Sequence, residues 1–389
     1  MLSAYGEGNQ FRTPGNADSL PASSLRLFAS GVTGDVSIGF GTRTQFAAGY
    51  RGGYSYNNRY SELNGPSHTA WFELRTDPAR HTVLTLGAQG ESGLISDALF
   101  GPSYLLTVAS RAQSPSELSD GILNATAVSQ LDSAVDLAIS AGRRRAGAAY
   151  ATVSRSVSRR FTAHLRIGAL RELHSYSRER LVAARYPNTT VTTADLDLAF
   201  SLSPRTRIHG TAGYVRSASR DYRSNWQTGG IGLERQFGRA SFGSVQAGYM
   251  RLAEPGTSGF GTSSYTVAGA YGTTKRYHSL ALLCRRGMGD LHGLGALSTT
   301  ECNAAWSWTP PATGWRLAGS LGYERFGGGT LDALEAWVGQ ASAVRTLGRH
   351  FELSFTGVYL SYAASGLASV NRSALRIALA WRPDPERRR

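Results

Sequence analysis

The chain has 389 residues, a formal net charge of +14, 41% hydrophobic residues and 17% charged residues. It is too apolar for a disordered chain, and because it has no apolar run of about 18 residues, we expect no transmembrane helix. Most of its cations are arginine, and apart from Arg143-Arg144-Arg145 and Arg387-Arg388-Arg389 they are spread along the chain. Scattered arginines do not make a nucleic-acid-binding stripe, so we expect no nucleic acid partner and favour lipid phosphates or anionic solutes.

The N-terminal residues 1–23 are rich in Gly, Pro, Ser and Asn and show no hydrophobic period. They predict an irregular N-terminal segment, or a partial plug if the rest of the chain encloses a lumen.

From about residue 24 to residue 381, segments alternate apolar and polar side chains with a period of two. The clearest is Ala194–Phe200, where leucines and a phenylalanine share one face while Asp195 and Asp197 share the other. Each segment has about 8–11 residues, which is the length that a tilted strand needs to cross a membrane. The charges fall almost entirely on the polar parity, as expected if a lipid-facing charge costs about 2–4 kcal/mol.

Short turns separate these segments near residues 42, 78, 159, 205, 239, 274, 312 and 348, and Ser114–Asp120 is predicted as a ninth turn in the widest gap. Longer polar stretches lie between them, at 172–192, 215–225, 251–263, 284–303 and 360–372. Nine turns and a last strand give about 19 strands, but a closed antiparallel barrel with both termini on one side needs an even number. Two regions remain open: 24–40 forms one long strand or two short ones, and 121–157 has no clear register.

The fold class that we predict is therefore all-β: a single transmembrane antiparallel β-barrel of about 18 strands, with 16–20 as the range. It spans 24–381, has short periplasmic turns and long extracellular loops, and is followed by a basic C-terminal tail at 382–389. Closure of the sheet satisfies every backbone amide, which lipid cannot do. The alternative, a soluble propeller or sandwich, would show turns every 8–12 residues.

Aromatic residues bracket several turns, as in Phe40-GTRTQ-Phe46 and Trp308-TPPATG-Trp315. Rings beside polar turns are typical of the membrane–water interface. The predicted aromatic girdle comprises Phe40, Phe46, Phe200, Phe237, Phe242, Tyr271, Tyr277, Trp308, Trp315, Phe351 and Trp381.

The last segment, Ser373–Trp381, alternates apolar residues and ends on an aromatic. It resembles the C-terminal strand of the Gram-negative outer-membrane β-barrel superfamily, although here a tail follows the aromatic. Within that superfamily, the glycine, tyrosine and turn pattern is similar to that of porins associated with exopolysaccharide export. The resemblance covers about residues 24–381 and implies a bacterial outer-membrane location. The implied partners are outer-membrane lipid or lipopolysaccharide, the barrel-assembly machinery, and polysaccharide or small polar solutes.

Met1–Glu7 lacks the basic start and apolar core of a secretory signal peptide. An outer-membrane protein needs such a signal. Either the chain begins after a removed signal, or its start is truncated, or the barrel interpretation is wrong.

Charges on the polar parity predict the lining of the lumen. A barrel of about 16–18 strands usually leaves an aqueous channel, and an excess of cations in it would favour anionic solutes. The alternative is a closed interior filled by salt bridges, in a barrel used for surface binding or anchoring. The predicted lumen-lining residues are Glu73, Arg75, Asp136, His164, Arg166, Asp195, Asp197, Arg207, His209, Arg316, Glu324 and Arg376.

Other chemistry has less support. Cys284 and Cys302 bracket a polar stretch, and in an oxidising compartment we predict a disulfide between them. Two thiols without nearby paired histidines do not predict a metal site, and we expect no cofactor. For an outer-membrane hydrolase the nearest candidates are Asp221, Asp290 and His292, which we interpret as solvated loop charges. We therefore expect a channel rather than an enzyme.

Overall fold

The computed structural model describes residues 2–12, 23–40, 43–55, 64–94, 143–175, 188–219, 223–253, 262–290, 296–310, 313–328, 331–364 and 370–381. Within these ranges the regular elements are all β-strands. No helix among these residues is long and apolar enough to cross a membrane. The predicted features at Ser114–Asp120, Asp136, Asp221, His292 and 382–389 lie outside the described residues.

Eighteen strands form one sheet. Their bounds are β1 (Leu2–Arg12), β2 (Ser23–Phe40), β3 (Thr44–Ser55), β4 (Gly65–Ala79), β5 (Thr82–Leu94), β6 (Arg143–Ser156), β7 (Phe161–Ser175), β8 (Thr189–Ser203), β9 (Thr206–Ser219), β10 (Arg223–Phe237), β11 (Ser241–Ala253), β12 (Thr262–Lys275), β13 (His278–Asp290), β14 (Ala296–Trp308), β15 (Trp315–Gly328), β16 (Leu331–Leu347), β17 (Phe351–Ala364) and β18 (Val370–Trp381).

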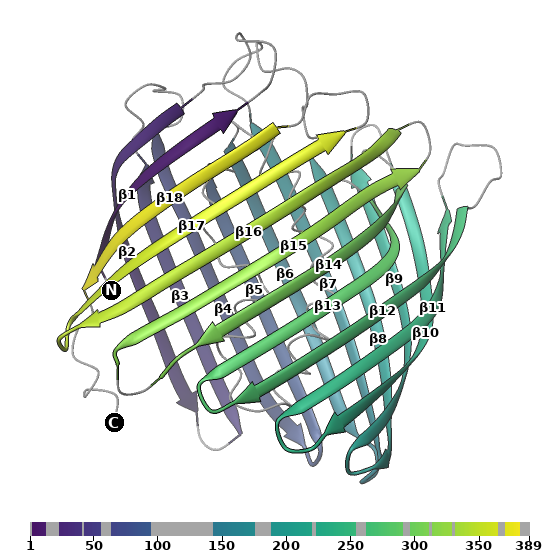
Figure 1. Cartoon of the computed structure of the whole chain (residues 1–389). Coiled ribbons are helices and arrows are strands. Elements are labelled where there is room, and N and C mark those ends of the chain that lie inside the picture. Colours follow the sequence, from purple (N-terminus) through teal and green to yellow (C-terminus); the bar gives the residue numbers. More distant parts are fainter. Residues whose placement is uncertain are drawn as a thin grey trace.

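Every strand pairs in antiparallel fashion with its neighbours along the chain, and the sheet closes because β1 pairs with both β2 and β18. Leu2 lies opposite Val32 on one side and Trp381 on the other. Figure 1 shows β13–β17 crossing the front of the barrel and β3–β8 behind them. The closed ring leaves no free sheet edge, so its backbone groups are satisfied internally. The prediction of a single antiparallel barrel of about 18 strands is confirmed.

The strand number is right, but two errors in the prediction cancel. The described residues form eight short turns where nine are predicted, because β5 pairs directly with β6 from Leu94↔Arg143 to Thr82↔Arg155. The ring therefore has no place between them for the two strands expected on either side of Ser114–Asp120. In compensation, the N-terminus adds β1, so the count of about 19 loses two strands and gains one. Region 24–40 belongs to one strand, β2.

The predicted irregular segment at 1–23 is wrong for residues 2–12, which form β1. This strand is rich in Gly, Asn and Gln, so it carries no hydrophobic alternation that would mark it as a strand. Its backbone pairing with β18 runs through eleven positions. Backbone pairing with two neighbours, rather than a side-chain pattern, makes this segment a strand.

Several predicted long loops are shorter in the structure. Strand β9 continues to Ser219 and β10 begins at Arg223, so most of 215–225 is paired. Likewise β13 reaches Asp290 and β14 begins at Ala296, which leaves a connection of five residues within 284–303. Beyond the membrane border both faces of a strand meet water, so polar composition no longer marks the end of the strand.

The two faces of the wall differ in polarity. One parity of each strand carries exposed apolar side chains, such as Leu165 and Ile167 on β7 or Ile231 and Leu233 on β10. The opposite parity carries charges level with these apolar residues, such as Arg166 on β7 and Glu234 on β10. A continuous exposed apolar surface is unstable in water but is the surface that lipid requires. The exposed apolar parity is therefore the outer face of a transmembrane barrel, and the other parity faces inward.

The aromatic girdle lies at the short-turn end of the outer face. Phe351 begins β17 directly opposite Trp381, which ends β18, and Phe200, Phe237, Tyr271 and Tyr277 are exposed there as well. Phe46, Trp308 and Trp315 share the outward parity. The side chain of Phe40 lies outside the described residues.

Phe242 does not belong to the girdle. The turn between β10 and β11 pairs Phe237 with Ser241, so Phe242 pairs with Gln236 on the inward face. There the Phe242 side chain is fully buried. Two rings that flank a turn share a face only when the register allows it, which the sequence pattern alone does not show.

Candidate functional site: the barrel lumen

The lumen is lined by inward side chains of strands that are far apart in the sequence. The register places the predicted residues that the structure describes on the inward parity of β4, β7, β8, β9, β15 and β18. These are Glu73, Arg75, His164, Arg166, Asp195, Asp197, Arg207, His209, Arg316, Glu324 and Arg376.

Tyr150 on β6 links three of the lining strands. Its hydroxyl donates a hydrogen bond of 2.6 Å to Glu73 on β4, and Arg166 on β7 lies 5.3 Å from the centre of its ring. The ring crosses β5 at Gly87, where any Cβ would collide with it. Glycine at this position thus lets an aromatic ring lie flat on the wall and bind across an intervening strand.

His209 on β9 bridges two carboxylates. Its Nδ1 atom lies 3.3 Å from Asp197 Oδ1 on β8, and its Nε2 atom lies 3.3 Å from Glu234 Oε2 on β10. An imidazolium has two donors on opposite sides of its ring, so it can serve both neighbouring strands. Glu234 was not among the predicted lining residues.

Further ion pairs connect the inward faces of adjacent or alternate strands. Arg285 on β13 binds Glu301 on β14 through two nitrogens, at 2.6 Å and 2.5 Å, and Arg316 on β15 lies 2.7 Å from Glu352 on β17. Arg144 on β6 lies between Glu91 and Glu172. Paired charges of this kind satisfy one another and leave less free charge for a passing solute.

The charge balance of the described part of the wall does not show the expected excess of cations. On the strands whose side chains are described, the inward arginines number seven and the inward carboxylates nine. The arginines are Arg75, Arg144, Arg166, Arg207, Arg285, Arg316 and Arg376, and the carboxylates are Glu73, Glu91, Glu172, Asp195, Asp197, Glu234, Glu301, Glu324 and Glu352. The net positive charge of the chain therefore lies elsewhere, mostly on turns and on the outer face.

One part of the inner wall is exposed. We call the inward faces of β3–β5 the open arc, because Gln45, Trp71, Arg75 and Gln89 are all exposed there. The Trp71 side chain is 38% exposed although it shares the inward parity of Glu73. Its partners across the sheet are Gly49 and Gln89. An exposed indole on the inward face means that there is free space in front of it.

The inward faces of β9–β14 form a closed arc. Trp226 is 5% exposed and pairs with Val215 and Leu252, which are buried with it. Met250 and the partly buried Val191 complete this cluster. Leu283 and Ala305 on β13 and β14 are buried too. In the ring of 18 strands β13 lies nine positions from β4, so the two arcs face each other.

Cys284 and Cys302 form a disulfide between β13 and β14. The two residues are direct partners, and the strands stay paired for six further positions, to Asp290↔Ala296. The bond thus lies within the paired hairpin, on the outward parity. The expectation that it closes the base of a long loop at 284–303 is wrong.

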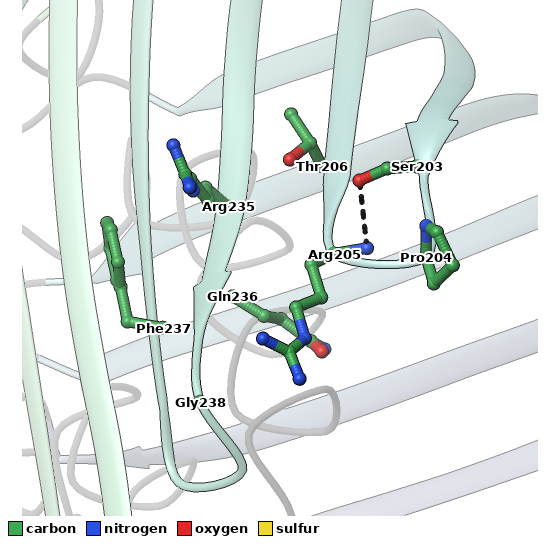
Figure 2. Close-up of a pocket in the computed structure, with 8 residues that line it drawn as sticks. All are labelled: Ser203, Pro204, Arg205, Thr206, Arg235, Gln236, Phe237 and Gly238. Atoms are coloured by element: carbon green, nitrogen blue, oxygen red, sulfur yellow. Dashed lines mark hydrogen bonds between the residues drawn. The ribbon is translucent and has the colours of Figure 1, made fainter.

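A groove of about 500 Å³ marks the short-turn rim between β8, β9 and β10. Figure 2 shows Arg205 and Gln236 projecting beside the turn, with Arg235 and Phe237 further along the end of β10. The backbone N–H of Gln236 donates to the Arg205 backbone carbonyl at 2.8 Å, and the backbone N–H of Arg205 donates to the Ser203 hydroxyl at 3.2 Å. Since Arg235 and Phe237 are outward residues, the groove opens toward the lipid border.

Sequence reasoning missed Trp71, Gln89, Tyr150, Arg285 and Glu301 on the inner wall. Parity could have found them, because Trp71 and Glu73 alternate with the outward Phe72. Attention to charge alone passed over the inward aromatic residues, and Arg285 and Glu301 were missed because 284–303 was predicted as a loop.

Comparison with known proteins found no matching family model and no matching curated protein. Solved structures with a similar arrangement include OpdO of Pseudomonas aeruginosa, with 12% identity and a TM-score of 0.49, covering 98% of this chain and 96% of that one. OccK2 (OpdF) of the same organism in complex with glucuronate has 11% identity, a TM-score of 0.47 and coverages of 98% and 97%. OccAB4 of Acinetobacter baumannii has 9% identity, a TM-score of 0.46 and coverages of 98% and 97%.

The closed ring, the apolar outer face and the charged inner face define the class of protein: a porin-like transmembrane β-barrel. This conclusion rests on the strand pairing and exposure of the chain itself.

Proposed function

We propose that the protein is an outer-membrane channel for small polar solutes in a Gram-negative bacterium. The observation that carries the proposal is the open arc, where the inward Trp71, Arg75 and Gln89 side chains are exposed. In an interior filled by salt bridges these side chains would be covered. In this proposal the short turns, at the same end as Leu2 and Trp381, face the periplasm.

The solutes that the open arc suits are uncharged polar molecules, including sugars. An exposed indole offers a flat apolar surface for the C–H face of a sugar ring, and the neighbouring amide of Gln89 can bind hydroxyl groups. The near balance of inward charge does not favour anions. Polysaccharide export by the same lumen would use these contacts too. No catalytic step is part of the proposal. Asp290, one of the hydrolase candidates, is the last residue of β13.

The test is single-channel conductance of the refolded protein in a planar bilayer, with ion selectivity measured from the reversal potential. We expect large steps with weak ion preference, and transient block of the current by maltotriose. Trp71→Ala should shorten the blocking events by roughly fivefold. Phe72→Ala, which removes the adjacent outward ring, serves as the matched control and should leave block unchanged.

Folded, heat-modifiable protein without conductance would contradict the channel and support the second candidate, a closed barrel that binds or anchors through its loops. Conductance without sugar block would retain the channel and exclude sugars as its solutes.

A further inference from the structure

Some of the arginines outside the lumen lie on the outer face in a regular pattern. On β9, β11 and β15 a tyrosine and an arginine stand two residues apart on the outward parity: Tyr214 and Arg216, Tyr249 and Arg251, Tyr323 and Arg325. All six side chains belong to strands that run from a short turn toward the long-loop end.

The tyrosine and the arginine lie at the same distance from the short turn on each of the three strands. The last turn residues are Arg205, Ala240 and Gly314, so the tyrosine follows nine residues after the turn and the arginine eleven. At about 3.3 Å per residue, nine residues are about 30 Å of strand. At the tilt of about 40° typical of membrane barrels this spans about 23 Å of membrane, close to the apolar band of about 25 Å. The tyrosines therefore stand at the upper border of the lipid and the arginines just beyond it.

Three more outward arginines lie near this height. Arg171 on β7 stands eleven residues after its turn, Arg145 on β6 pairs with Leu173, and Arg286 on β13 stands nine residues after its turn, with its guanidinium 5.2 Å from the Tyr265 ring centre. All six arginines are exposed. We call Arg145, Arg171, Arg216, Arg251, Arg286 and Arg325 the arginine belt. Adjacent strands are about 5 Å apart and alternate strands about 10 Å, so the belt offers cations at these intervals along the wall from β6 to β15.

The belt has little charge compensation from the described residues. Arg325 lies 3.5 Å from Glu335 in an exposed pair, and exposed pairs contribute little. Arg145, Arg171, Arg216 and Arg251 make no ion pair with any residue in the described ranges. Exposed guanidinium groups without ion partners among the described residues, at a lipid border, are available to anions from outside the chain.

We propose that the arginine belt binds the phosphate groups of lipid headgroups in the leaflet at the long-loop end. A guanidinium presents a planar pair of donors that matches phosphate oxygens. The tyrosine rings below it pack against the first acyl segments while their hydroxyls stay in the polar layer. The acyl chains then lie on the exposed apolar wall, which includes Val245 on β11 and Leu321 on β15. This partner is independent of whether the lumen conducts.

The test uses the full chain refolded in detergent, with a bis-phosphorylated lipid A as the probe and bound lipid counted by native mass spectrometry. The triple variant Arg216→Gln, Arg251→Gln, Arg325→Gln should bind the lipid roughly 100-fold more weakly, at about fivefold per arginine. The wild-type protein should bind a dephosphorylated form of the same lipid with a similar loss.

The control is a second triple variant, Arg80→Gln, Arg159→Gln, Arg239→Gln, which removes the same charge from exposed short turns. It should keep its lipid affinity within about threefold. Equal loss in both variants would reduce the effect to net charge and overturn the proposal, as would equal binding of the dephosphorylated lipid. Heat-modifiable migration on a gel reports whether each variant has folded.

Discussion

The open arc and the closed arc face each other across one lumen, yet the same type of residue behaves differently in each. Trp71 on β4 is 38% exposed between Gly49 and Gln89, whereas Trp226 on β10 is 5% exposed between Val215 and Leu252. Both are inward tryptophans on well-paired strands. The difference shows that cross-strand neighbours decide whether an inward side chain serves packing or remains available to a solute.

The largest expected contrast is between the two tryptophans. Trp226→Ala leaves a cavity in the buried cluster and should lower the free energy of unfolding by about 3–5 kcal/mol. Trp71→Ala, on the open arc, should change it by less than about 1 kcal/mol. Urea unfolding in detergent, followed by tryptophan fluorescence, measures both. Similar losses in the two variants would contradict the division into arcs.

Two arginines sharpen the comparison at smaller magnitude. Arg285→Ala leaves the buried Glu301 carboxylate without its cation and should destabilise the barrel by about 2–3 kcal/mol. Arg75→Ala on the open arc removes an exposed side chain that has no ion pair within the described residues, so we expect a change within about 0.5 kcal/mol. The same unfolding assay applies. A large loss for Arg75→Ala would mean that the open arc is covered.

The smallest expected effect concerns the edge of the open arc. Tyr150→Phe removes the hydrogen bond to Glu73 and should cost about 1 kcal/mol. The outward Tyr214→Phe removes only an exposed hydroxyl, 3.3 Å from Asn225, and should cost no more than about 0.5 kcal/mol. Melting temperatures measured in one detergent compare the pair. The reverse order would show that Tyr150 does not hold β4 to β6.

The fold could be predicted from the sequence because the period-two alternation survives in most strands, as in Ala194–Phe200. The prediction failed at β1, where Gly, Asn and Gln hide the alternation, and in placing two barrel strands between β5 and β6, which pair directly. Loop lengths were overestimated because polar residues continue the strands into water. These errors arise wherever backbone pairing continues without an apolar face to mark it.

The lining of the lumen could be predicted in part, since parity assigns a face once the strand is known. Which inward residues are exposed could not be predicted, because that depends on registers between strands. Phe242 illustrates this point: its ring turns inward because Phe237 pairs with Ser241. The excess of inward carboxylates also depends on register, whereas the net charge of the whole chain is positive.

The pairing of Leu2 with Trp381 makes the two chain ends the seam of the barrel. Every other pair joins consecutive strands, which can form in order, but the seam joins β1 to β18 and can form only after β18 has been synthesised. Loss of either β1 or β18 would leave seventeen strands. A sheet with an odd number of strands cannot close through an antiparallel pair of edge strands. Such a chain would keep two open edges, each a site for pairing with another chain.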